Sequence, residues 1–412
     1  MKYVIIGNST AAIGGIEGIR SQDTNSEIVV LSNEAYHTYS RPLISYLLQG
    51  KTDLERMKYR DDNFYKEMNC QLKLETYVTE IHPDKKEIVT QTGEVIGYDK
   101  LLVATGSRPF VPTIEGLEKV ENQFTFMTLD SAKALGEKIN EKSKVLIVGA
   151  GLIGLKCAEA ISKKVASLTV CDIAPHVLSS IVDMECGARL KKHLENYNIQ
   201  FKLGTGVQKL DAHTAYFQDG TTVEFDILVL AVGVRPNVEL VQQAGGRVNR
   251  GIILDEYCQT SLENIYAAGD CTESVDLTDG NQKILAILPN AYRQGECAGI
   301  NMALGKQKFD KAIPMNAIGF FGLHLISAGS YEGEEIITQD ENNYKKLIVK
   351  DDLLKGFMML GDVEGAGIYT SIIREQIPLS SLNFELLKER PGLIAFSRNY
   401  RDDKLGGRKN EH

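Results

Sequence analysis

One segment of the chain has the spacing of a phosphate-binding turn. In KVLIVGAGLIGLKCAEAIS (144–162), three glycines form Gly-x-Gly-x-x-Gly between an apolar strand and a helix. The first glycine permits a tight turn, the second lets a pyrophosphate approach the backbone, and the third lets the helix pack closely on the strand. Free N–H groups and the helix dipole favour negative charge at this end. The residues predicted to contact a dinucleotide here are Gly149, Gly151, Leu152, Ile153 and Gly154.

An acidic residue follows this turn at the expected distance. The next strand, SLTVCD (167–172), ends at Asp172, which is 23 residues after Gly149 (172 − 149). A carboxylate there accepts a hydrogen bond from the adenosine 2′-OH and repels a 2′-phosphate. Residues 173–176 contain no arginine that would bind that phosphate. The pattern favours NADH over NADPH, and the alternative is a structural turn that no longer binds its ligand.

A second, less regular turn lies near the start of the chain. GNSTAA (7–12) follows the strand KYVII, but Ser9 and Ala12 replace the second and third glycines. Both residues are small, and a serine is tolerated if its φ is negative; its hydroxyl could then reach a phosphate oxygen. The ribose-binding acid is Asn33 or Glu34, of which we favour Glu34. The predicted dinucleotide contacts of this turn are Gly7, Asn8, Ser9 and Ala12.

These turns belong to two β-turn-α-β units, which predict an α/β protein with two Rossmann-like dinucleotide-binding domains. From about residue 308 short strands form a meander that turns on Asp351 and Asp352, and the polar stretch from Leu386 is expected to fray. The meander predicts a C-terminal α+β interface domain. The expected domains are 1–112 with 242–307 for the first dinucleotide, 113–241 for the second, and 308–412 for the interface.

Composition limits the other classes of function. The 412 residues carry a formal net charge of −9, which argues against nucleic acid as a partner. Because no apolar run reaches the ~18–20 residues of a membrane span, we expect a cytoplasmic protein without a membrane partner. The seven cysteines include no C-x₂-C or C-x₄-C pair, and the seven histidines form no metal-ligand pattern. No metal site is predicted.

Six motifs in order carry a family resemblance: GNSTAA, YSRPLIS (39–45), LLVATGSRP (101–109), GAGLIGL, AVGVRPN and IYAAGDC. Together they resemble the FAD-dependent pyridine nucleotide oxidoreductases, within them the group of NADH:rubredoxin reductases and nitrite reductase flavoproteins. The resemblance implies bound FAD and NADH as substrate. It implies further FAD contacts at Arg41, Pro42, Val78, Ala104, Thr105, Gly106, Gly269, Asp270 and Ala291, and an NAD contact at Gly233.

Two of these contacts have stated roles in the resemblance. Asp270 would accept a hydrogen bond from a hydroxyl of the flavin's ribityl-pyrophosphate region. Ala291 would open a helix, beginning YRQGECAG, whose N-terminus faces the pyrimidine edge of the flavin. A helix dipole in that place stabilises negative charge on the reduced ring.

The missing cysteines indicate where electrons go. Disulfide reductases of this family carry a C-x₄-C pair, and related oxidases one cysteine, in the stretch that is TYSRPLISYLLQG (38–50) here and contains none. Electrons would therefore leave the flavin directly, for a rubredoxin or a ferredoxin-like subunit, including one associated with carbon-monoxide dehydrogenase. The alternatives are an NADH oxidase or diaphorase with oxygen or small acceptors, and an NADH-binding flavoprotein sensor without turnover. Interface domains of such reductases also suggest a homodimer.

One charged residue is a catalytic candidate. Ferredoxin reductases of this group pair a lysine beside the flavin with a glutamate two residues after the last glycine of the NAD turn, and here Tyr46 and Lys156 take these places. We hypothesise that Lys156 lies near the flavin–nicotinamide contact and stabilises the anionic reduced flavin. In the alternative, Lys156 faces solvent and pairs with Glu159 at i, i+3.

Overall fold

The computed structural model describes residues 1–405, which form two compact units. The first unit comprises residues 1–180, 187–275 and 282–310, and the second comprises 181–186, 276–281 and the chain from Lys311 onward. In the described part of the chain no helix is long and apolar enough to cross a membrane.

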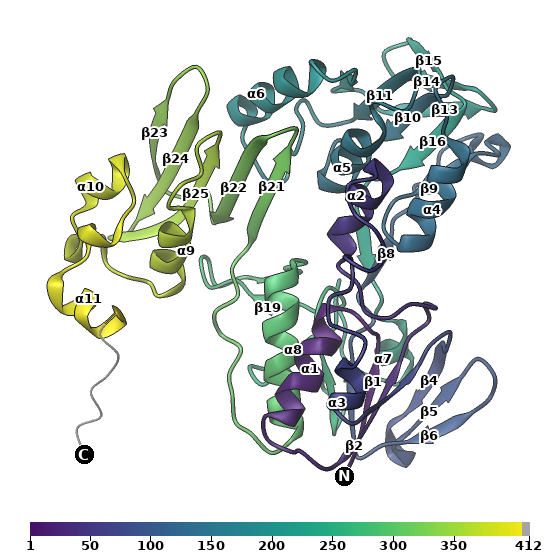
Figure 1. Ribbon diagram of the computed structural model, residues 1–412, viewed down its shortest axis with the longest axis vertical. Helices are drawn as coiled ribbons and strands as arrows, with labels where there is room; N and C mark the ends of the chain where they lie inside the picture. The colour runs from purple at the N-terminus through teal and green to yellow at the C-terminus, as the bar shows by residue number, and fades with distance from the viewer. Residues whose placement is uncertain (406–412) are drawn as a thin grey trace. The chain divides into compact units, whose positions relative to one another are not determined.

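Two five-stranded parallel sheets form the framework of the first unit (Figure 1). The first sheet has the order β18-β7-β1-β2-β3, and its strands are β1 (Lys2–Ile6), β2 (Glu27–Leu31), β3 (Cys70–Lys73), β7 (Lys100–Val103) and β18 (Ile265–Ala267). The second has the order β12-β11-β10-β16-β9, with β9 (Gln123–Thr125), β10 (Lys144–Val148), β11 (Ser167–Asp172), β12 (Gln200–Leu203) and β16 (Ile227–Leu230). The strands β1, β2, β7, β10 and β16 are mostly apolar because both faces of a parallel sheet are covered.

The two halves of this unit repeat each other beyond the glycine turns. A three-stranded antiparallel sheet precedes β7, and another precedes β16. Their strands are β4 (Val78–His82), β5 (Glu87–Thr90), β6 (Val95–Gly97), β13 (Val207–Asp211), β14 (Thr214–Phe217) and β15 (Thr222–Glu224). The repeat confirms the predicted pair of Rossmann-like folds. The connections between the halves, β8 (Ser107–Pro109) and β17 (Val234–Pro236), pair antiparallel.

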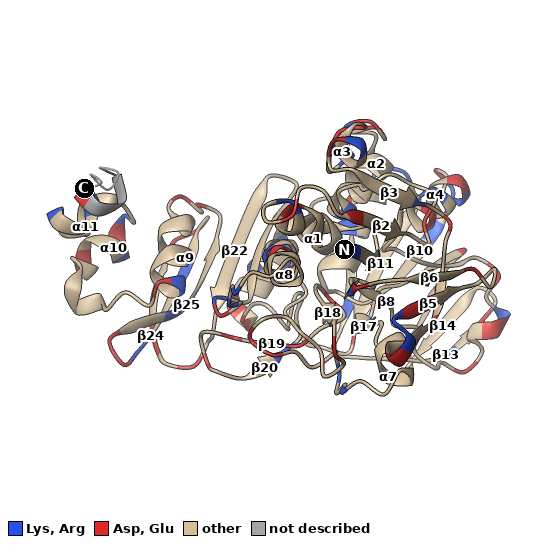
Figure 2. Cartoon of the chain, turned by 90° about the horizontal axis from the view of Figure 1, so that it is seen from below, with Lys and Arg blue, Asp and Glu red and all other residues tan. Residues whose placement is uncertain are grey.

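Helices and short strands complete the first unit. Charged residues gather on the helices and loops around the sheets, and α3 and α4 each carry both signs of charge (Figure 2). The helices are α1 (Thr10–Arg20), α2 (Ile44–Gln49), α3 (Phe64–Glu67), α4 (Leu129–Lys138), α5 (Leu152–Ile161), α7 (Glu239–Gln243) and α8 (Leu288–Met302), and α6 (Met184–Glu195) begins in the second unit. A small antiparallel pair is formed by β19 (Ser274–Val275) and β20 (Gln282–Lys283). Single 3₁₀ turns cover Arg41–Leu43, Pro83–Lys85 and Leu117–Lys119.

Helices α1 and α8 pack against each other through glycines, and Figure 1 shows them side by side. A Cβ built on Gly14 would lie 2.2 Å from the carbonyl oxygen of Tyr292, and one built on Gly18 would lie 2.3 Å from that of Glu296. From the other side, a Cβ on Gly299 would lie 2.2 Å from the Gly15 oxygen. The two backbones therefore touch directly, with no side chain between them at these positions.

The second unit is a five-stranded antiparallel sheet with helices. The order is β21-β22-β25-β24-β23, with β21 (Met315–Phe320), β22 (Leu323–Gly329), β23 (Glu334–Gln339), β24 (Tyr344–Lys350) and β25 (Leu353–Leu360). The helices are α9 (Ala366–Arg374), α10 (Phe384–Glu389) and α11 (Arg398–Leu405), with 3₁₀ turns at Leu379–Ser381 and Leu393–Ala395. Asp351 and Asp352 both have positive φ, which confirms the predicted meander turn between β24 and β25.

The expectation that the chain frays from Leu386 is wrong for most of that stretch. Asn383 caps α10 by accepting a hydrogen bond from the backbone of Leu386. Leu387, Ala395 and Phe396 are buried in the core of the second unit, so tertiary packing orders this polar segment. The remainder of the stretch, 406–412, lies outside the described residues.

The α1–α8 contact predicts a large effect of a single methyl group. We expect Gly299→Ala to lower the free energy of unfolding by about 1–3 kcal/mol, or more, because overpacking forces two backbones apart. The matched control is Gly367→Ala in α9, where a Cβ meets nothing within 4 Å and where alanine should be neutral or stabilising. Chemical denaturation of the two variants compares them, and equal stability would contradict the packing described for α1 and α8.

Candidate active site

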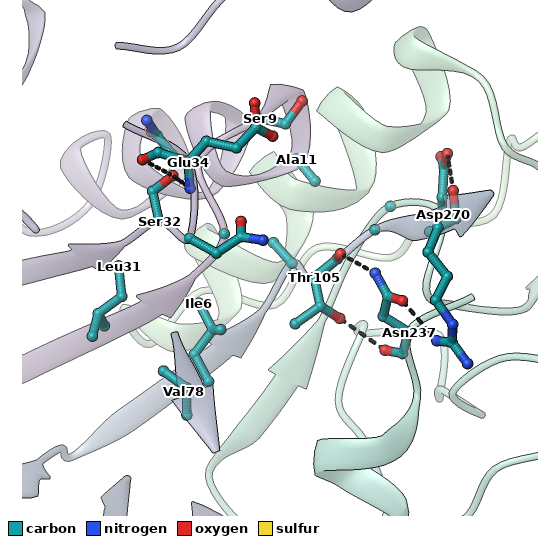
Figure 3. A pocket seen from close by; sticks show the side chains of 18 of the residues that line it. Ile6, Ser9, Ala11, Leu31, Ser32, Glu34, Val78, Thr105, Asn237 and Asp270 are labelled. Atoms are coloured by element: carbon teal, nitrogen blue, oxygen red, sulfur yellow. Dashed lines mark hydrogen bonds between the residues drawn. The ribbon is translucent and has the colours of Figure 1, made fainter. Parts of the chain in front are cut away.

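A cavity of about 620 Å³ opens in the first unit at the carboxyl ends of β1, β2, β7 and β18 (Figure 3). Open α/β sheets bind ligands at this edge. Of the fourteen predicted FAD residues, twelve line the cavity: Gly7, Asn8, Ser9, Glu34, Arg41, Val78, Ala104, Thr105, Gly106, Gly269, Asp270 and Ala291. The other two, Ala12 and Pro42, do not line it; Ala12 is fully buried in the core beneath.

The two glycine turns have the same backbone conformation. Gly7 and Gly149 both have φ +115°. A Cβ on Gly7 would lie 2.2 Å from the carbonyl oxygen of Ala104, just after β7, and one on Gly149 would lie 2.3 Å from that of Ala231, just after β16. At the next key position, Ser9 (φ −117°) and Gly151 (φ −81°) are both extended. Because that position needs no positive φ, serine fits where glycine is usual, as the sequence analysis required.

Glycine is required more strictly at the third position of the NAD turn. A Cβ on Gly154 would lie 2.0 Å from the carbonyl oxygen of Gly149, whereas one on Gly151 would point into open space. The open space beside Gly151 is where a phosphate can approach the backbone. The chain therefore keeps glycine at the packing position and leaves room at the ligand position.

Two helices direct their first turns at the cavity. Ser9 precedes α1 without forming a side-chain cap, and Thr10 and Ala11 line the cavity. The predicted start of the second helix is Ala291, but α8 begins at Leu288. Proline at residue 289 suits the first turn of a helix, which explains the earlier start. Leu288 and Ala291 both line the cavity, so both helices present N–H groups that favour a negative ligand.

Glu34, the predicted ribose acid, is held by two neighbours that lie close to it in sequence. Its carboxylate accepts a hydrogen bond from the Tyr39 hydroxyl at 2.7 Å and forms an ion pair with Arg41. Burial raises the pKa of Tyr39, so its hydroxyl remains a donor. The same hydroxyl accepts a hydrogen bond from the Leu129 backbone at 3.0 Å. Tyr39 therefore ties Glu34 to helix α4, a contact that no sequence pattern predicted.

Asp270 lies at the opposite end of the cavity from Val78 (Figure 3). Burial raises the pKa of its carboxyl group, and the Ser107 hydroxyl donates to it at 3.3 Å. The Gln294 side chain, which is buried in α8, accepts from the Gly269 backbone at 2.7 Å. Gln294 therefore fixes the Gly269–Asp270 turn, and no sequence motif marked it.

The residues of the cavity fit a bound FAD. The Nε2 atom of His37, a cavity-lining residue, is buried and has no hydrogen-bond partner among the described residues. Such a group needs a partner that the protein itself does not supply, and a phosphate or ribose oxygen would satisfy it. Together with the two helix N-termini and the close-packed Gly7 turn, His37 makes this cavity suited to a dinucleotide.

Asp172 lies beside the second glycine turn. Its carboxylate accepts hydrogen bonds from the backbone N–H groups of Ala150 at 2.7 Å and Ala174 at 2.9 Å. These bonds hold the acid next to the open space at Gly151, where the adenosine ribose of NADH would follow the pyrophosphate. Gly233 has φ +101°, and a Cβ there meets nothing within 4 Å. The residues of this turn therefore fit a bound NADH.

Lys156 does not line the cavity. It forms an ion pair with Glu159, as the alternative stated, but its side chain is only 15% exposed, so it does not face solvent freely. Its ammonium lies 4.9 Å from the centre of the Tyr46 ring on α2. The structure therefore places Lys156 where α2 packs on α5, between the two halves of the unit.

Most of the cysteines are buried thiols. All seven are free, and none lines the cavity. Burial raises the pKa of Cys171 to about 12 and that of Cys271 to about 11, so both remain thiols near neutral pH. Within residues 1–405, no group of three or more His, Cys, Asp or Glu side chains could hold a metal ion.

The chain matches two protein families. Residues 1–295 match the pyridine nucleotide-disulphide oxidoreductases, and residues 314–377 match the rubredoxin NAD⁺ reductase C-terminal domain. Because the first match covers more than half of the chain, the protein belongs to the pyridine nucleotide-disulphide oxidoreductase family. It is an FAD-dependent oxidoreductase that uses a nicotinamide cofactor, with a rubredoxin-reductase type C-terminal domain.

Curated relatives extend the match over most of the chain. The epsilon subunit of the NADH-dependent phenylglyoxylate dehydrogenase of Aromatoleum evansii is 31% identical over 92% of this chain and 93% of its own length. An NADH oxidase of Methanocaldococcus jannaschii is 32% identical over 75% and 71%. The assimilatory nitrate reductase electron transfer subunit of Bacillus subtilis is 29% identical over 88% of this chain, which spans about half (48%) of that protein.

Solved structures confirm the fold. A NAD-dependent persulfide reductase from A. fulgidus aligns with a TM-score of 0.85 and 27% identity, over 93% of this chain and 79% of that one. Putidaredoxin reductase, in its covalent complex with putidaredoxin, aligns with a TM-score of 0.86 and 24% identity, over 94% and 95%.

Asp270 provides a test of the cavity. We expect Asp270→Asn to weaken FAD binding about 10- to 150-fold, since a hydrogen bond to a charged acceptor contributes ~1.5–3 kcal/mol. Burial raises the pKa of the Asp270 carboxyl group in the folded protein. Its contribution to stability therefore falls as the pH rises through that folded-state pKa. The FAD-free Asp270→Asn variant should accordingly be at least as stable as the parent protein at neutral pH.

Flavin fluorescence during titration of FAD-free protein measures the affinity, and thermal unfolding measures the stability. The control is Asp310→Asn, which changes an exposed carboxylate outside the cavity lining. FAD affinity unchanged in Asp270→Asn would place the cofactor's hydroxyl groups elsewhere.

Proposed function

We propose that this protein oxidises NADH and passes the electrons, through its FAD, to the iron centre of a small protein such as a rubredoxin or a ferredoxin-like subunit. One observation carries the proposal: no cysteine lines the FAD cavity, and Cys271, which follows the cavity residue Asp270 in sequence, is a buried thiol whose pKa is raised by burial. FAD supplies the conversion of two-electron hydride chemistry to single-electron transfer.

The absent thiol relay favours acceptors that take electrons directly. In disulfide reductases a cysteine pair carries electrons from the flavin to the substrate; here Tyr39, Arg41 and Ser45 occupy the corresponding stretch. The match of residues 314–377 to the rubredoxin NAD⁺ reductase C-terminal domain supports an iron-protein acceptor. So does the 32% identity to Salmonella proteins named nitric oxide reductase FlRd-NAD⁺ reductase.

The acceptor could also be a permanent subunit. The relative from Aromatoleum evansii is named as one subunit of an NADH-dependent dehydrogenase and matches this chain along nearly its whole length. This supports a ferredoxin-like subunit as acceptor, which includes a subunit associated with carbon-monoxide dehydrogenase. The second candidate function is an NADH oxidase or diaphorase, favoured by the relative of that name from Methanocaldococcus jannaschii. A sensor without turnover is the third.

Several finer features belong to the same proposal. The Asp172 carboxylate supports NADH over NADPH because it would repel a 2′-phosphate. We further propose that the halves 1–112 with 242–307 and 113–241 bind FAD and NADH separately, and that 308–412 mediates homodimerisation. We propose a cytoplasmic location, without nucleic acid or membrane as partner.

Stopped-flow reduction of defined acceptors tests the function. NADH should bleach the bound flavin anaerobically, and oxidised rubredoxin or ferredoxin should then reoxidise it at least about tenfold faster than air-saturated buffer does. Turnover should be unaffected by iodoacetamide, because the cysteines are not part of the electron path. Faster reoxidation by oxygen would establish the oxidase, and failure of NADH to bleach the flavin would establish the sensor.

We propose that Lys156 stabilises the reduced, anionic flavin from its place between α2 and α5. Its ammonium is mostly buried, beside the Tyr46 ring, on the helix that begins at the NADH turn. Glu159 compensates part of the charge. A buried cation acts over a longer distance than an exposed one because solvent screens it less.

Replacing this lysine should change the flavin potential. We expect Lys156→Met to lower the midpoint potential by about 30 mV, which corresponds to ~1.4 kcal/mol for a two-electron couple, because the reduced anion loses a nearby positive charge. Spectroelectrochemistry measures the shift. Lys163→Met, which removes an exposed charge just after the same helix, is the control. A potential equal to that of the control would leave Lys156 with a purely structural role.

A further inference from the structure

We propose that Asn237 is a positioning residue that fastens the two connections between the FAD and NADH halves, and thereby holds Thr105 and Gly106 in the shape that FAD binding requires. This inference rests on FAD occupying the cavity described above. It assigns a function to a residue that lies outside the glycine turns and that lines the cavity beside the turn it holds.

The two connections run side by side. After β7 the chain leaves the first sheet through the cavity-lining turn 104–106 and continues as β8. After β16 it returns as β17, which pairs antiparallel with β8 in a register that places Pro236 opposite Ser107. Asn237 is the first residue after β17, so it lies beside the turn. Contacts that hold this two-stranded ribbon of β8 and β17 together therefore also hold the cavity-lining turn 104–106.

Asn237 joins the returning connection to the outgoing one with four hydrogen bonds, three to the turn and one to β8. Its side-chain Nδ2 donates to the carbonyl oxygen of Thr105 at 2.8 Å, and the Thr105 hydroxyl donates back to the Asn237 carbonyl oxygen at 2.8 Å (Figure 3). The backbone N–H of Asn237 donates to the Gly106 oxygen at 2.9 Å. Arg108 donates to Oδ1 of Asn237 at 2.8 Å.

An amide side chain is needed for this arrangement. The side chain donates on one side, to Thr105, and accepts on the other, from Arg108. A carboxylate of the same shape can accept from Arg108 but cannot donate to the Thr105 carbonyl, and alanine can do neither. Glu239 pairs with the same Arg108, which keeps the guanidinium in place. Only a side chain that donates to one partner and accepts from the other satisfies both.

The hydrogen bonds of Asn237 affect FAD binding because they order the turn at Thr105 and Gly106. Gly106 has φ +64°, and with Thr105 it forms the cavity wall between Gly7 and Asp270. Because Asn237 engages the hydroxyl and carbonyl of Thr105 and the carbonyl of Gly106, the turn is ordered by contacts within the protein. A wall that is ordered in advance lowers the entropy lost on binding, so loosening it should reduce the affinity for FAD.

A near-isosteric substitution tests the inference through pH. At neutral pH the carboxylate introduced by Asn237→Asp faces the Thr105 carbonyl oxygen, and we expect FAD binding to weaken about tenfold, the factor that ~1.4 kcal/mol of a lost hydrogen bond produces. As the pH falls and this carboxyl group is protonated, it regains a donor for Thr105. The affinity of the variant relative to the parent protein should therefore recover toward acidic pH.

The charged groups around the introduced carboxyl are Arg108 on β8, Glu239 on α7 and Asp270 at the far side of Ser107. These groups are present in both the variant and the parent protein. The ratio of the two FAD dissociation constants at each pH, measured by flavin fluorescence, therefore cancels most of the effect of their titration. Asn237→Ala provides the comparison, since it removes the donor at every pH. Asn122→Asp, which adds the same charge outside this ribbon, is the control.

A loss in Asn237→Asp that does not vary with pH, or FAD affinity unchanged in both Asn237 variants, would overturn the inference. If Asn237→Asp does not fold, Thr105→Val removes the hydroxyl bond to Asn237 and leaves the Asn237 amide in place, and it should weaken FAD binding without any pH dependence. Failure of the proposed acceptor would be seen separately, because the parent protein would still bind FAD and be bleached by NADH.

Discussion

The close contact between α1 and α8 is the constraint on which the first unit depends. The two helices come from opposite ends of that unit's sequence, and their backbones touch at Gly14, Gly18, Gly295 and Gly299. This contact places the first turns of both helices at one cavity, where one faces the predicted pyrophosphate and the other the predicted flavin ring. Two positive helix ends in one cavity favour a ligand that carries negative charge at two separate points.

Features that depend on local backbone geometry could be predicted from the sequence. The turn at Gly7 is as tight as the turn at Gly149, and both have φ +115°, which only glycine adopts readily. Ser9 was acceptable on the condition that its φ is negative, and the structure meets this condition with φ −117°. Strand, turn and helix are specified within about 20 residues, so the repeated α/β fold and the two dinucleotide turns were accessible without a structure.

The residues that position the site were less accessible, because their partners are distant in sequence. Tyr39 reaches the backbone of Leu129, and Asn237 reaches Thr105. Gln294 fixes the turn at Gly269 from one face of a helix whose other face packs on α1. None of these side chains belongs to a periodic pattern. The start of α8, by contrast, could have been predicted correctly, because the proline at residue 289 is a local signal for the first turn of a helix.

The lack of a thiol beside the flavin moves the choice of electron acceptor away from the cavity. A cysteine relay selects substrates by covalent chemistry within a few ångströms, whereas direct electron transfer selects them by which protein surface can approach the flavin. Surface residues are constrained weakly by the fold, so one sequence carries little information about the partner they fit. The same separation explains why the family and its cofactors follow from a few glycines and acids, whereas the partner depends on the protein surface around the flavin.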